Sequence, residues 1–437
     1  MHSADLWAKL APGHFPALLS WCVLVGAAAL LGHMVHRVSG FPRMLGYTAV
    51  GLVAGWLGFG DLPWPLRGNT ALLLEIAVGT SVLVAASQIS LRWLFKQPWL
   101  LLQSLGESLI TLGLTAGLLV ALGWGWPVAL AVGVIAMAAS PAVLLRIAED
   151  LRASGAVTDR SVLLATVSSW LALLAGLVLT ASWVPVSVAL GAATGAEPAQ
   201  LTQMRFSVSG LLAGLYNVAL SLLWAALLAA ALWPVLRWKS SRSDTTALYL
   251  LAALAATCLM AEHWGGSAVF AFMVAGLLLR NLSAKPLLWP QAFQAANAML
   301  NLVMFVLVAS MAAQVQLNGA MFFVVLCVVL ARMMGKLGSI LLLGHGTGLG
   351  WRRQWPVACA QLPLSGLALV LASSIAWQWM PLNPGVAQQV SAIALPLIVI
   401  CELLGVLAAS AALWRSGEAH RGIGRTALLR GEKRHDT

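Results

Sequence analysis

The sequence predicts an all-α polytopic membrane protein of about 13 transmembrane helices, arranged as two inverted repeats with two proline-broken crossing helices. The first observation is composition, because 60% of the 437 residues are hydrophobic and only 9% are charged, whereas soluble domains carry roughly 25% charged residues. The second is that apolar runs of about 20 residues, the length that crosses a bilayer, recur along the chain. The third is that basic residues collect in alternate linkers.

Thirteen apolar segments meet the length requirement, with Pro, Gly or charged residues between them. They cover roughly 15–36, 43–60, 70–91, 98–122, 125–148, 158–185, 207–236, 244–262, 265–281, 290–314, 318–343, 354–377 and 386–414. We expect one transmembrane domain, residues 1–414, followed by a solvated basic cytoplasmic tail, 415–437. The first segment is long for a cleaved leader and is predicted to be a retained helix. The longest linker, at about 186–206, is too short for a separate soluble domain.

The distribution of basic residues predicts the orientation. With the segments above, 20 of the 25 Lys and Arg residues fall on one side of the membrane, and the opposite side receives Lys9, Arg67 and Arg205. Lys and Arg are enriched in cytoplasmic loops. We therefore expect a multi-pass protein of a bacterial-type inner (plasma) membrane, with the N-terminus outside and the C-terminus in the cytoplasm.

Several classes of function are disfavoured. The net charge is +11, but the basic residues lie in short linkers between apolar runs, so we expect no nucleic-acid partner. All five cysteines lie inside apolar runs without CxxC or Cys/His spacing, so neither a disulfide nor a metal site is predicted. We expect no cofactor, and the absence of a Ser/His/Asp set in the pattern argues against an enzyme. The predicted partners are the lipid bilayer and a small solute.

Proline interrupts two segments at membrane depth. Ser140 precedes Pro141 in the fifth segment, and Gln361 precedes Pro363 in the twelfth. Proline leaves a backbone carbonyl without its hydrogen bond, and in lipid such groups must be satisfied inside a packed interior or a cavity. One break in each half matches the discontinuous helices that form midplane binding sites in two-repeat transporters. The alternative is a simple proline kink in each helix.

Charged residues at membrane depth are costly, so each requires a partner or a function. Arg332 and Lys336 are four residues apart on one face of the eleventh segment. Arg332 is interpreted as snorkelling to the interface or bonding loose carbonyls, and Lys336 either as structural or as part of a solute path. Glu75 and Glu107 are either helix-packing acids or proton carriers, and Glu402 is expected to be structural.

A hydroxyl cluster, Ser168 and Ser169, lies in the sixth segment, directly after the first break. Serine in a membrane helix usually bonds its own backbone or a neighbouring helix. Taken alone, this pair is interpreted as structural.

Four stretches, Phe41–Leu52, Glu75–Arg92, Ser140–Arg146 and Gly266–Leu277, carry a family resemblance. Together they resemble the cation:proton antiporter superfamily, and most closely its Kef-like monovalent cation:proton antiporter-2 branch. Lys336 matches a basic residue common on the corresponding helix. The resemblance implies an antiporter fold, a monovalent cation and a proton as transported partners, and a homodimer.

The sequence departs from the family pattern at the ion site. The sixth helix of the family normally carries one or two acids, whereas Ser168 and Ser169 stand there in this chain. A carboxylate can exchange a proton for a cation because both change its charge state, and a serine hydroxyl cannot. Either Glu75 or Glu107 therefore replaces the missing acid, or the coupling differs, or the protein has another role.

The favoured function is secondary active transport, a monovalent cation:proton antiport by alternating access. Ser140, Gln361 and the freed carbonyls would bind the ion, Ser168 and Ser169 would add neutral oxygens, and Lys336 would neutralise the site. One alternative is an anionic or neutral organic solute on the same fold, because the basic residues and half-helix N-termini favour negative charge. A second alternative is a non-transporting membrane scaffold or sensor.

Overall fold

The computed structural model describes residues 17–58, 64–188, 201–238, 244–283, 287, 289–315 and 318–419. The predicted tail from residue 420 onward and the first two residues of the first predicted segment lie outside the described residues. The same holds for Lys9, Lys239, Arg242 and Lys285, which contribute to the predicted charge asymmetry.

Helices form nearly all of the described chain. The first repeat comprises α2 (Ala17–Ser39), α3 (Met44–Trp56), α4 (Gly68–Ala86), α5 (Leu91–Phe95), α6 (Pro98–Ala121), α7 (Trp126–Met137), α8 (Pro141–Asp150) and α9 (Ala156–Ser182). After the linking helix α10 (Val208–Trp238), the second repeat comprises α11 (Asp244–Trp264), α12 (Ala268–Leu282), α13 (Gln291–Ala313), α14 (Gly319–Leu343), the 3-10 turn η2 (Gly344–Thr347), α15 (Trp351–Ala360), α16 (Gly366–Trp379) and α17 (Pro384–Arg415).

Each predicted segment coincides with one helix or with one interrupted pair of helices. Among the described residues, ten helical spans are long and apolar enough to cross a membrane, and three shorter apolar helices, α3, α12 and α16, complete the set. The polytopic all-α fold is confirmed, and 13 crossings remain a prediction with which these helices agree.

The packing of the helices reflects the inverted repeats. α3 packs on α13, and α4 packs on α12. In the two repeats α3 corresponds to α12 and α4 to α13. The α3–α13 contact and the α4–α12 contact are therefore equivalent under the symmetry of the repeats. α6 packs on its own counterpart, α14. The repeats therefore interlock and share one interior.

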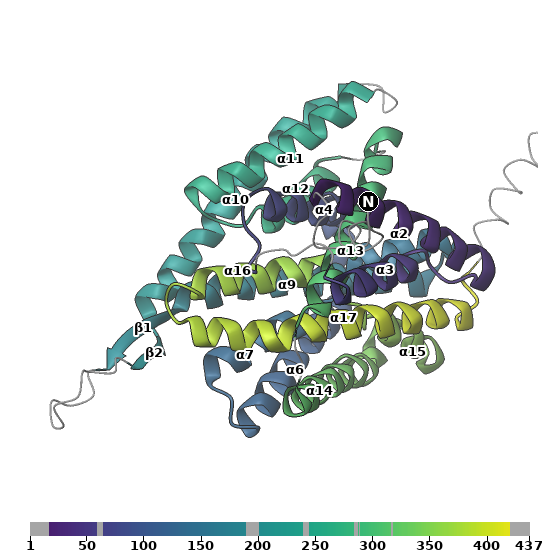
Figure 1. The fold of residues 1–437 in the computed structure, drawn as a ribbon. Coiled ribbons are helices and arrows are strands. Elements are labelled where there is room, and N and C mark those ends of the chain that lie inside the picture. Colours follow the sequence, from purple (N-terminus) through teal and green to yellow (C-terminus); the bar gives the residue numbers. More distant parts are fainter. Residues whose placement is uncertain are drawn as a thin grey trace, which may run out of the picture.

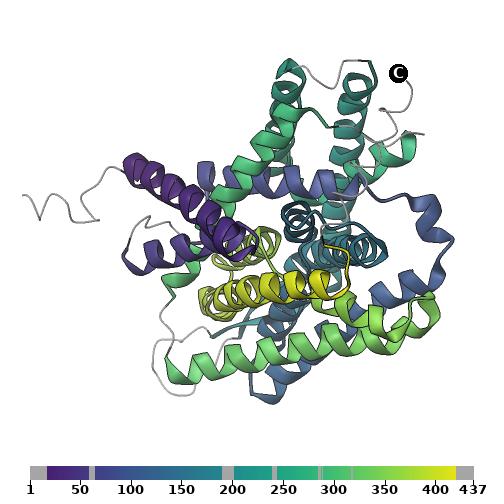
Figure 2. The same cartoon turned by 90° about the vertical axis from the view of Figure 1, so that its right-hand side faces the viewer.

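The figures place the helices in groups. α6, α7 and α14 lie along one side of the molecule and α10, α11 and α12 along the opposite side, with α9, α16 and α17 between them (Figure 1). In the perpendicular view α17 again runs through the middle of the molecule (Figure 2). Of the ten candidate spans among the described residues, Trp126–Asp150, which contains the first interruption, is the most buried, with 89% of its most apolar stretch inside the protein.

Two glycines allow α3 and α13 to approach closely. A Cβ atom on Gly51 would collide with the carbonyl oxygen of Val306, and one on Gly55 with that of Ser310. Small residues give membrane helices this kind of close contact, because dispersion forces between backbones replace the hydrophobic effect in lipid.

The longest predicted linker contains regular structure. β1 (Trp183–Val188) pairs antiparallel with β2 (Leu201–Phe206), with Trp183 opposite Phe206. The sixth predicted segment runs to residue 185, whereas α9 ends at Ser182, because a run rich in β-branched valines follows and favours a strand. The hairpin protrudes beyond the ends of α9 and α10 (Figure 1).

The start of the predicted solvated tail is packed rather than exposed. Glu418 is only 5% exposed, and its carboxylate accepts hydrogen bonds from the backbone N–H groups of Val157 and Thr158 and from the Thr158 hydroxyl. The side chain therefore caps the N-terminus of α9, where free N–H groups and the helix dipole attract an anion.

Candidate functional site

The two helix breaks meet at the centre of the molecule. α7 ends at Met137 and α8 begins at Pro141, while α15 ends at Ala360 and α16 begins at Gly366. The backbone N–H of Ser140 donates to the carbonyl of Pro363 at 3.1 Å. We call residues 138–140 and 361–365 the crossing. The predicted pair of proline-broken crossing helices is confirmed.

Local sequence explains the first break. Ser140 adopts an extended conformation and its side-chain oxygen accepts from the N–H of Val143, so it is the N-cap of α8. Pro141 follows at the first helical position, where no N–H is needed. Ser365 occupies the equivalent position before α16, and its hydroxyl lies 2.6 Å from that of Ser140.

Arg332 joins the two breaks from α14. Its guanidinium donates to the carbonyls of Ala136 at 2.9 Å, Ala138 at 2.9 Å and Leu362 at 2.7 Å, with a longer contact to Gln361 at 3.4 Å. These carbonyls lie at the ends of α7 and α15, where intrahelical donors run out. Arg332 is fully buried, so of its predicted roles the bonding of loose carbonyls is confirmed and snorkelling is wrong.

Lys336 lies one turn further along α14 and forms a buried ion pair with Glu107 of α6. Both side chains are 0% exposed. The ammonium also donates to the carbonyl of Met137 at 2.6 Å and to the hydroxyl of Ser168 at 3.0 Å. One ammonium therefore connects an acid of α6 to the backbone of the first break and to the hydroxyl pair of α9.

The two serines of α9 both face the first break. Ser168 donates to the carbonyl of Met137 at 2.6 Å, and Ser169 donates to that of Ala139. Both are fully buried. The two hydroxyls therefore lie beside the crossing, and each bonds a backbone carbonyl of the first break.

Gln361 lies in the second break and is fully buried. Its Nε2 donates to the carbonyl of Ser161 at 2.8 Å, whereas its Oε1 accepts no hydrogen bond from the described residues. A buried amide oxygen without a donor is uncommon. It remains free to bind a cation or a water molecule.

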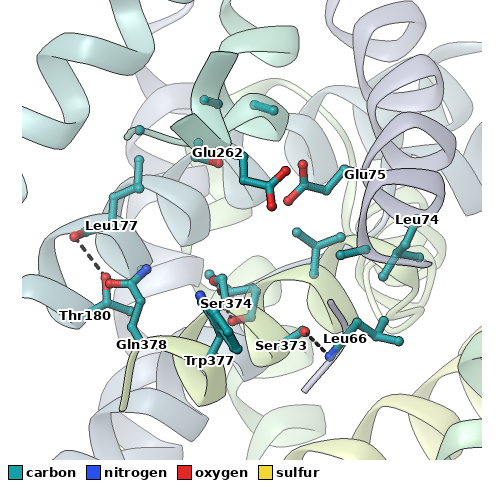
Figure 3. A pocket seen from close by; sticks show the side chains of 18 of the residues that line it. Leu66, Leu74, Glu75, Leu177, Thr180, Glu262, Ser373, Ser374, Trp377 and Gln378 are labelled. Carbon is teal, nitrogen blue, oxygen red and sulfur yellow. Dashed lines mark hydrogen bonds between the residues drawn. The ribbon is translucent and has the colours of Figure 1, made fainter. Parts of the chain in front are cut away.

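Glu75 lies apart from the Lys336 pair, in a cavity of about 470 Å³ at the end of the bundle where α4 begins and α16 ends. Figure 3 shows the carboxylates of Glu75 and Glu262 facing each other across its upper part. Leu173 and Val370 also line the cavity. Leu173 lies one helical turn after Ser169, and Ser169 contacts the crossing. Measured along α9, the lining of the cavity is therefore about 6 Å from the crossing.

Glu402 lies on α17 and contacts α3. It accepts a hydrogen bond from the Thr48 hydroxyl of α3 at 3.0 Å and is 1% exposed. This contact joins α3 to α17. The predicted structural interpretation of Glu402 agrees with this position.

The pairing of Glu107 with Lys336 was not predicted, although the sequence contains a signal for it. Buried polar residues follow α6 at helical spacing; they are Gln103, Ser104, Glu107, Ser108, Thr111 and Thr115. A polar stripe on an otherwise apolar membrane helix indicates a face that points into protein. Periodicity identifies such a face but not the helix that covers it.

Residues 24–413 match the family model described as "Sodium/hydrogen exchanger, transmembrane". The chain belongs to the sodium/hydrogen exchanger family. Members of this family are transporters rather than enzymes. No curated protein matches the chain in sequence.

Two solved structures of the sodium proton antiporter MjNhaP1 from Methanocaldococcus jannaschii resemble this exchanger-family chain. The structure at pH 8 is 15% identical, covers 92% of this chain and 97% of its own, and gives a TM-score of 0.61. The electron-microscopy structure is 16% identical, covers 90% and 97%, and gives a TM-score of 0.64. At this identity the likeness establishes the shared fold.

Proposed function

We propose that the chain is a secondary active transporter that exchanges a monovalent cation for a proton by alternating access. The Glu107–Lys336 pair would be its titrating unit. The cation would bind to the oxygens of Ser140, Ser169 and Gln361 and to the carbonyls of the first break. Membership of the sodium/hydrogen exchanger family supports this choice of substrates.

The buried ion pair carries the proposal. Sodium/hydrogen exchange requires a group that binds a proton in one state and not in the other, and the hydroxyls of α9 cannot do this near neutral pH. Glu107 and Lys336 are both 0% exposed and in contact, and Lys336 touches the first break directly. Of the two acids predicted as proton carriers, only Glu107 has this connection among the described contacts.

The geometry suggests how a cation and a proton compete. The ammonium of Lys336 lies 2.6 Å from the carbonyl of Met137, so a cation bound to the same carbonyls would be only a few Å away from it. Two positive charges about 4 Å apart repel by about 4 kcal/mol at an effective dielectric constant of 20. Cation entry would therefore favour loss of one proton from the Glu107–Lys336 pair, and proton return would favour release of the cation.

Access to the crossing would come from the Glu75 cavity on one side of the membrane. The predicted orientation makes this the outer side, because Arg67 at its rim belongs to the sparse set of outer basic residues. Its two carboxylates would attract cations. The empty or proton-loaded site must become accessible from the other side of the membrane. This would require the helices of the crossing to move relative to α3, α4, α12 and α13.

The narrower assignment to the Kef-like branch is part of the same proposal and rests on the four stretches named above. An anionic solute is disfavoured, because Arg332 is occupied by carbonyls and Lys336 by Glu107. A scaffold or sensor would give no solute flux.

Proton flux in proteoliposomes tests the proposal. Sodium, potassium or lithium is added in turn, and we expect at least one to move protons in the wild type. Glu107→Gln should abolish this movement, because it removes the titrating carboxyl while keeping its shape. Glu75→Gln should retain exchange with a raised half-saturating cation concentration.

Size-exclusion profiles and unfolding midpoints of the purified variants verify that they are folded. A folded wild type without flux for any cation would contradict antiport. If Glu107→Gln exchanged at the wild-type rate and Glu75→Gln lost exchange, the titrating group would be Glu75 in the cavity instead of Glu107.

A further inference from the structure

Ser104 lies on α6, one helical turn before Glu107, and its hydroxyl is unusual for a buried serine. The side chain is 0% exposed, yet its Oγ has no hydrogen-bond partner among the described residues. Buried polar atoms nearly always have a partner, because a hydrogen bond left unmade in the interior costs free energy. A hydroxyl held in this position without a partner therefore indicates a contact that forms in another state of the protein.

The neighbouring hydroxyls of the α6–α14 interface show how such groups are normally satisfied. Thr111 of α6 donates to the backbone carbonyl of Glu107 at 2.7 Å. Ser339 of α14 donates in the same way to the carbonyl of Gly335. A bond to the carbonyl four residues earlier is the usual solution for a hydroxyl inside a helix. Ser104 makes no such bond among the described contacts, so its hydrogen is available to another acceptor.

The acceptor within reach of Ser104 is the carboxylate of Glu107. Residues three apart on a helix have Cβ atoms about 5–6 Å apart, and a long helical side chain extends over the turn that precedes it. Gln103 donates to the carbonyl of Ile340, and Glu107 pairs with Lys336. Ser104 lies between these two contacts along α6, so it belongs to the same interface. In this structure the carboxylate is engaged by the ammonium instead.

The charged groups that face Glu107 come from α14. Lys336 forms the ion pair, and Arg332, one turn away, acts on Glu107 electrostatically. α7 also packs on α6 and has no titratable residue. The other titratable groups on elements that contact α6 are Cys327 on α14, Asp159 and Arg160 at the start of α9, Arg92 on α5 and His345 in η2. Lys336 is therefore the charge that balances Glu107 directly.

We propose that Ser104 is a positioning residue of the exchange, and that its hydroxyl binds the Glu107 carboxylate when Lys336 gives up its proton. The inference rests on the proposed function, because it concerns the cation-loaded state of the same pair. While Lys336 is charged, its ammonium satisfies the carboxylate and the Ser104 hydroxyl stays free. When cation entry expels one proton to the water, the lysine amine is neutral and the carboxylate has lost its counter-charge.

The hydroxyl then donates to the carboxylate. A hydrogen bond to an ionised group is roughly twice as strong as one between neutral groups. Ser104 therefore stabilises the state of the pair that has released its proton, and this is the state that the bound cation requires.

Two measurements on Ser104→Ala test this role. The first is proton flux in proteoliposomes, recorded against cation concentration and against pH. The second is the unfolding midpoint of the purified protein without added cation. Ser339→Ala is the matched control, because Ser339 is buried at the same interface but bonds its own backbone. Ser104→Cys is the conservative variant, since a thiol of similar size is still a weak donor.

We expect Ser104→Ala to raise the half-saturating cation concentration about tenfold, as the loss of a hydrogen bond to a charged group does. The pH of half-maximal exchange should move up by about one unit, because the pair then holds its proton more tightly. The maximal rate at saturating cation should stay near that of the wild type. Ser104→Cys should fall between the two proteins, and Ser339→Ala should match the wild type in both profiles.

The unfolding midpoint separates this role from a structural one. Because the hydroxyl has no partner in this structure, Ser104→Ala should unfold at the same temperature as the wild type or at a higher one. A lower midpoint together with unchanged cation and pH profiles would mean that Ser104 only supports the packing of α6, and would overturn the proposal.

Failure of this proposal and failure of antiport give different results. Exchange by the wild type, with the same cation and pH dependence in Ser104→Ala, would overturn the role of Ser104 and leave antiport intact. A folded wild type without flux for any cation would overturn both.

Discussion

Lys336 and Glu107 stabilise each other in a place where neither could remain charged alone. Moving an ion out of water costs several kcal/mol even after relaxation, and this cost is offset only while the partner is present. The hydrogen bonds of Lys336 to Met137 and Ser168 add donors and acceptors around the pair. At the scale of single residues, the pair is therefore both a structural and a functional unit.

We expect Lys336→Met to lower the free energy of unfolding by about 3–5 kcal/mol, because it leaves the Glu107 carboxylate buried and unpaired. The double variant Lys336→Met/Glu107→Gln should recover much of this loss, since no charge is left uncompensated. Thermal unfolding of purified protein measures both. A double variant as unstable as the sum of its single variants would mean that the two side chains are not coupled.

A carboxylate transferred to α9 should restore function. Ser168 lies 3.0 Å from the ammonium of Lys336, so Ser168→Asp in the Glu107→Gln background would supply a new acid for the same lysine. We expect cation-dependent proton flux to return to at least a tenth of the wild-type rate. Ser168→Asn in that background is the matched control, because its side chain has the shape of aspartate but carries no titrating carboxyl group.

The residues of the site differ in how far the sequence could predict them. Ser140 and Gln361 lie in the crossing, and Ser168 and Ser169 lie beside it, as the order of segments indicates. The partner of Lys336 could not be predicted, since Glu107 is separated from it by more than 200 positions and helical periodicity does not specify neighbours. The cost of burying charge indicates only that some partner exists.

At the scale of elements, the two breaks could be predicted from proline together with a neighbouring hydroxyl or amide. Proline alone is insufficient, because Pro356 lies inside α15 and Pro396 inside α17 without ending either helix. The break at Ser140 adds an N-cap that starts a new helix. The hairpin of β1 and β2 was missed because no short turn motif marks it.

The cap on α9 is a second feature of this scale. Glu418 accepts hydrogen bonds from the first N–H groups of α9 at 2.8–2.9 Å, so Glu418→Ala leaves two buried donors without a partner. We expect a loss of about 1–2 kcal/mol in the free energy of unfolding, measured by thermal denaturation. Glu418→Gln should lose less, because its amide oxygen still accepts. Equal stability of all three proteins would exclude a contribution from the cap.

Gly155→Ala offers an independent check on the same contact. A Cβ at this position would meet the carboxylate of Glu418, so this substitution should displace the cap without removing its charge. Gly155 also has φ +157°, a conformation that strains alanine, so Gly155→Ala should destabilise the wild type more than Glu418→Ala does. It should cost less in the Glu418→Ala background than in the wild type, because the cap is already lost there.

At the scale of the whole molecule, contacts at the cavity end connect the segment before α4 to α16 and α17. The N–H of Leu66 donates to the Ser373 hydroxyl at 3.1 Å, and Trp64 donates to the Ser391 hydroxyl at 2.8 Å. Alternating access by bundle movement requires such contacts to open and close. They are few and polar, which suits an interface that rearranges.

A cross-link between residues 66 and 373 should stop transport. After replacement of the five native cysteines, Leu66→Cys/Ser373→Cys joined by a short thiol reagent should lose more than nine-tenths of its cation-driven proton flux. A disulfide formed between the same two thiols by mild oxidation should block the flux in the same way, and its reduction should restore the flux. Leu66→Cys alone, treated in the same way, controls for modification. Full flux in the cross-linked protein would mean that these two positions do not separate during transport.

The charges of the proposed titrating pair and of Arg332 have an electrical consequence. Arg332, Lys336 and Glu107 together hold a single positive charge, and a cation that enters as one proton leaves keeps the total constant. The site would then carry the same net charge across the membrane when it holds the cation and when it returns with the proton. A membrane voltage of 100 mV acts on each net charge with about 2.3 kcal/mol, but across the full cycle the two movements would cancel. Such an exchanger would be driven by the cation and proton gradients alone and would work as well in a depolarised membrane as in a polarised one.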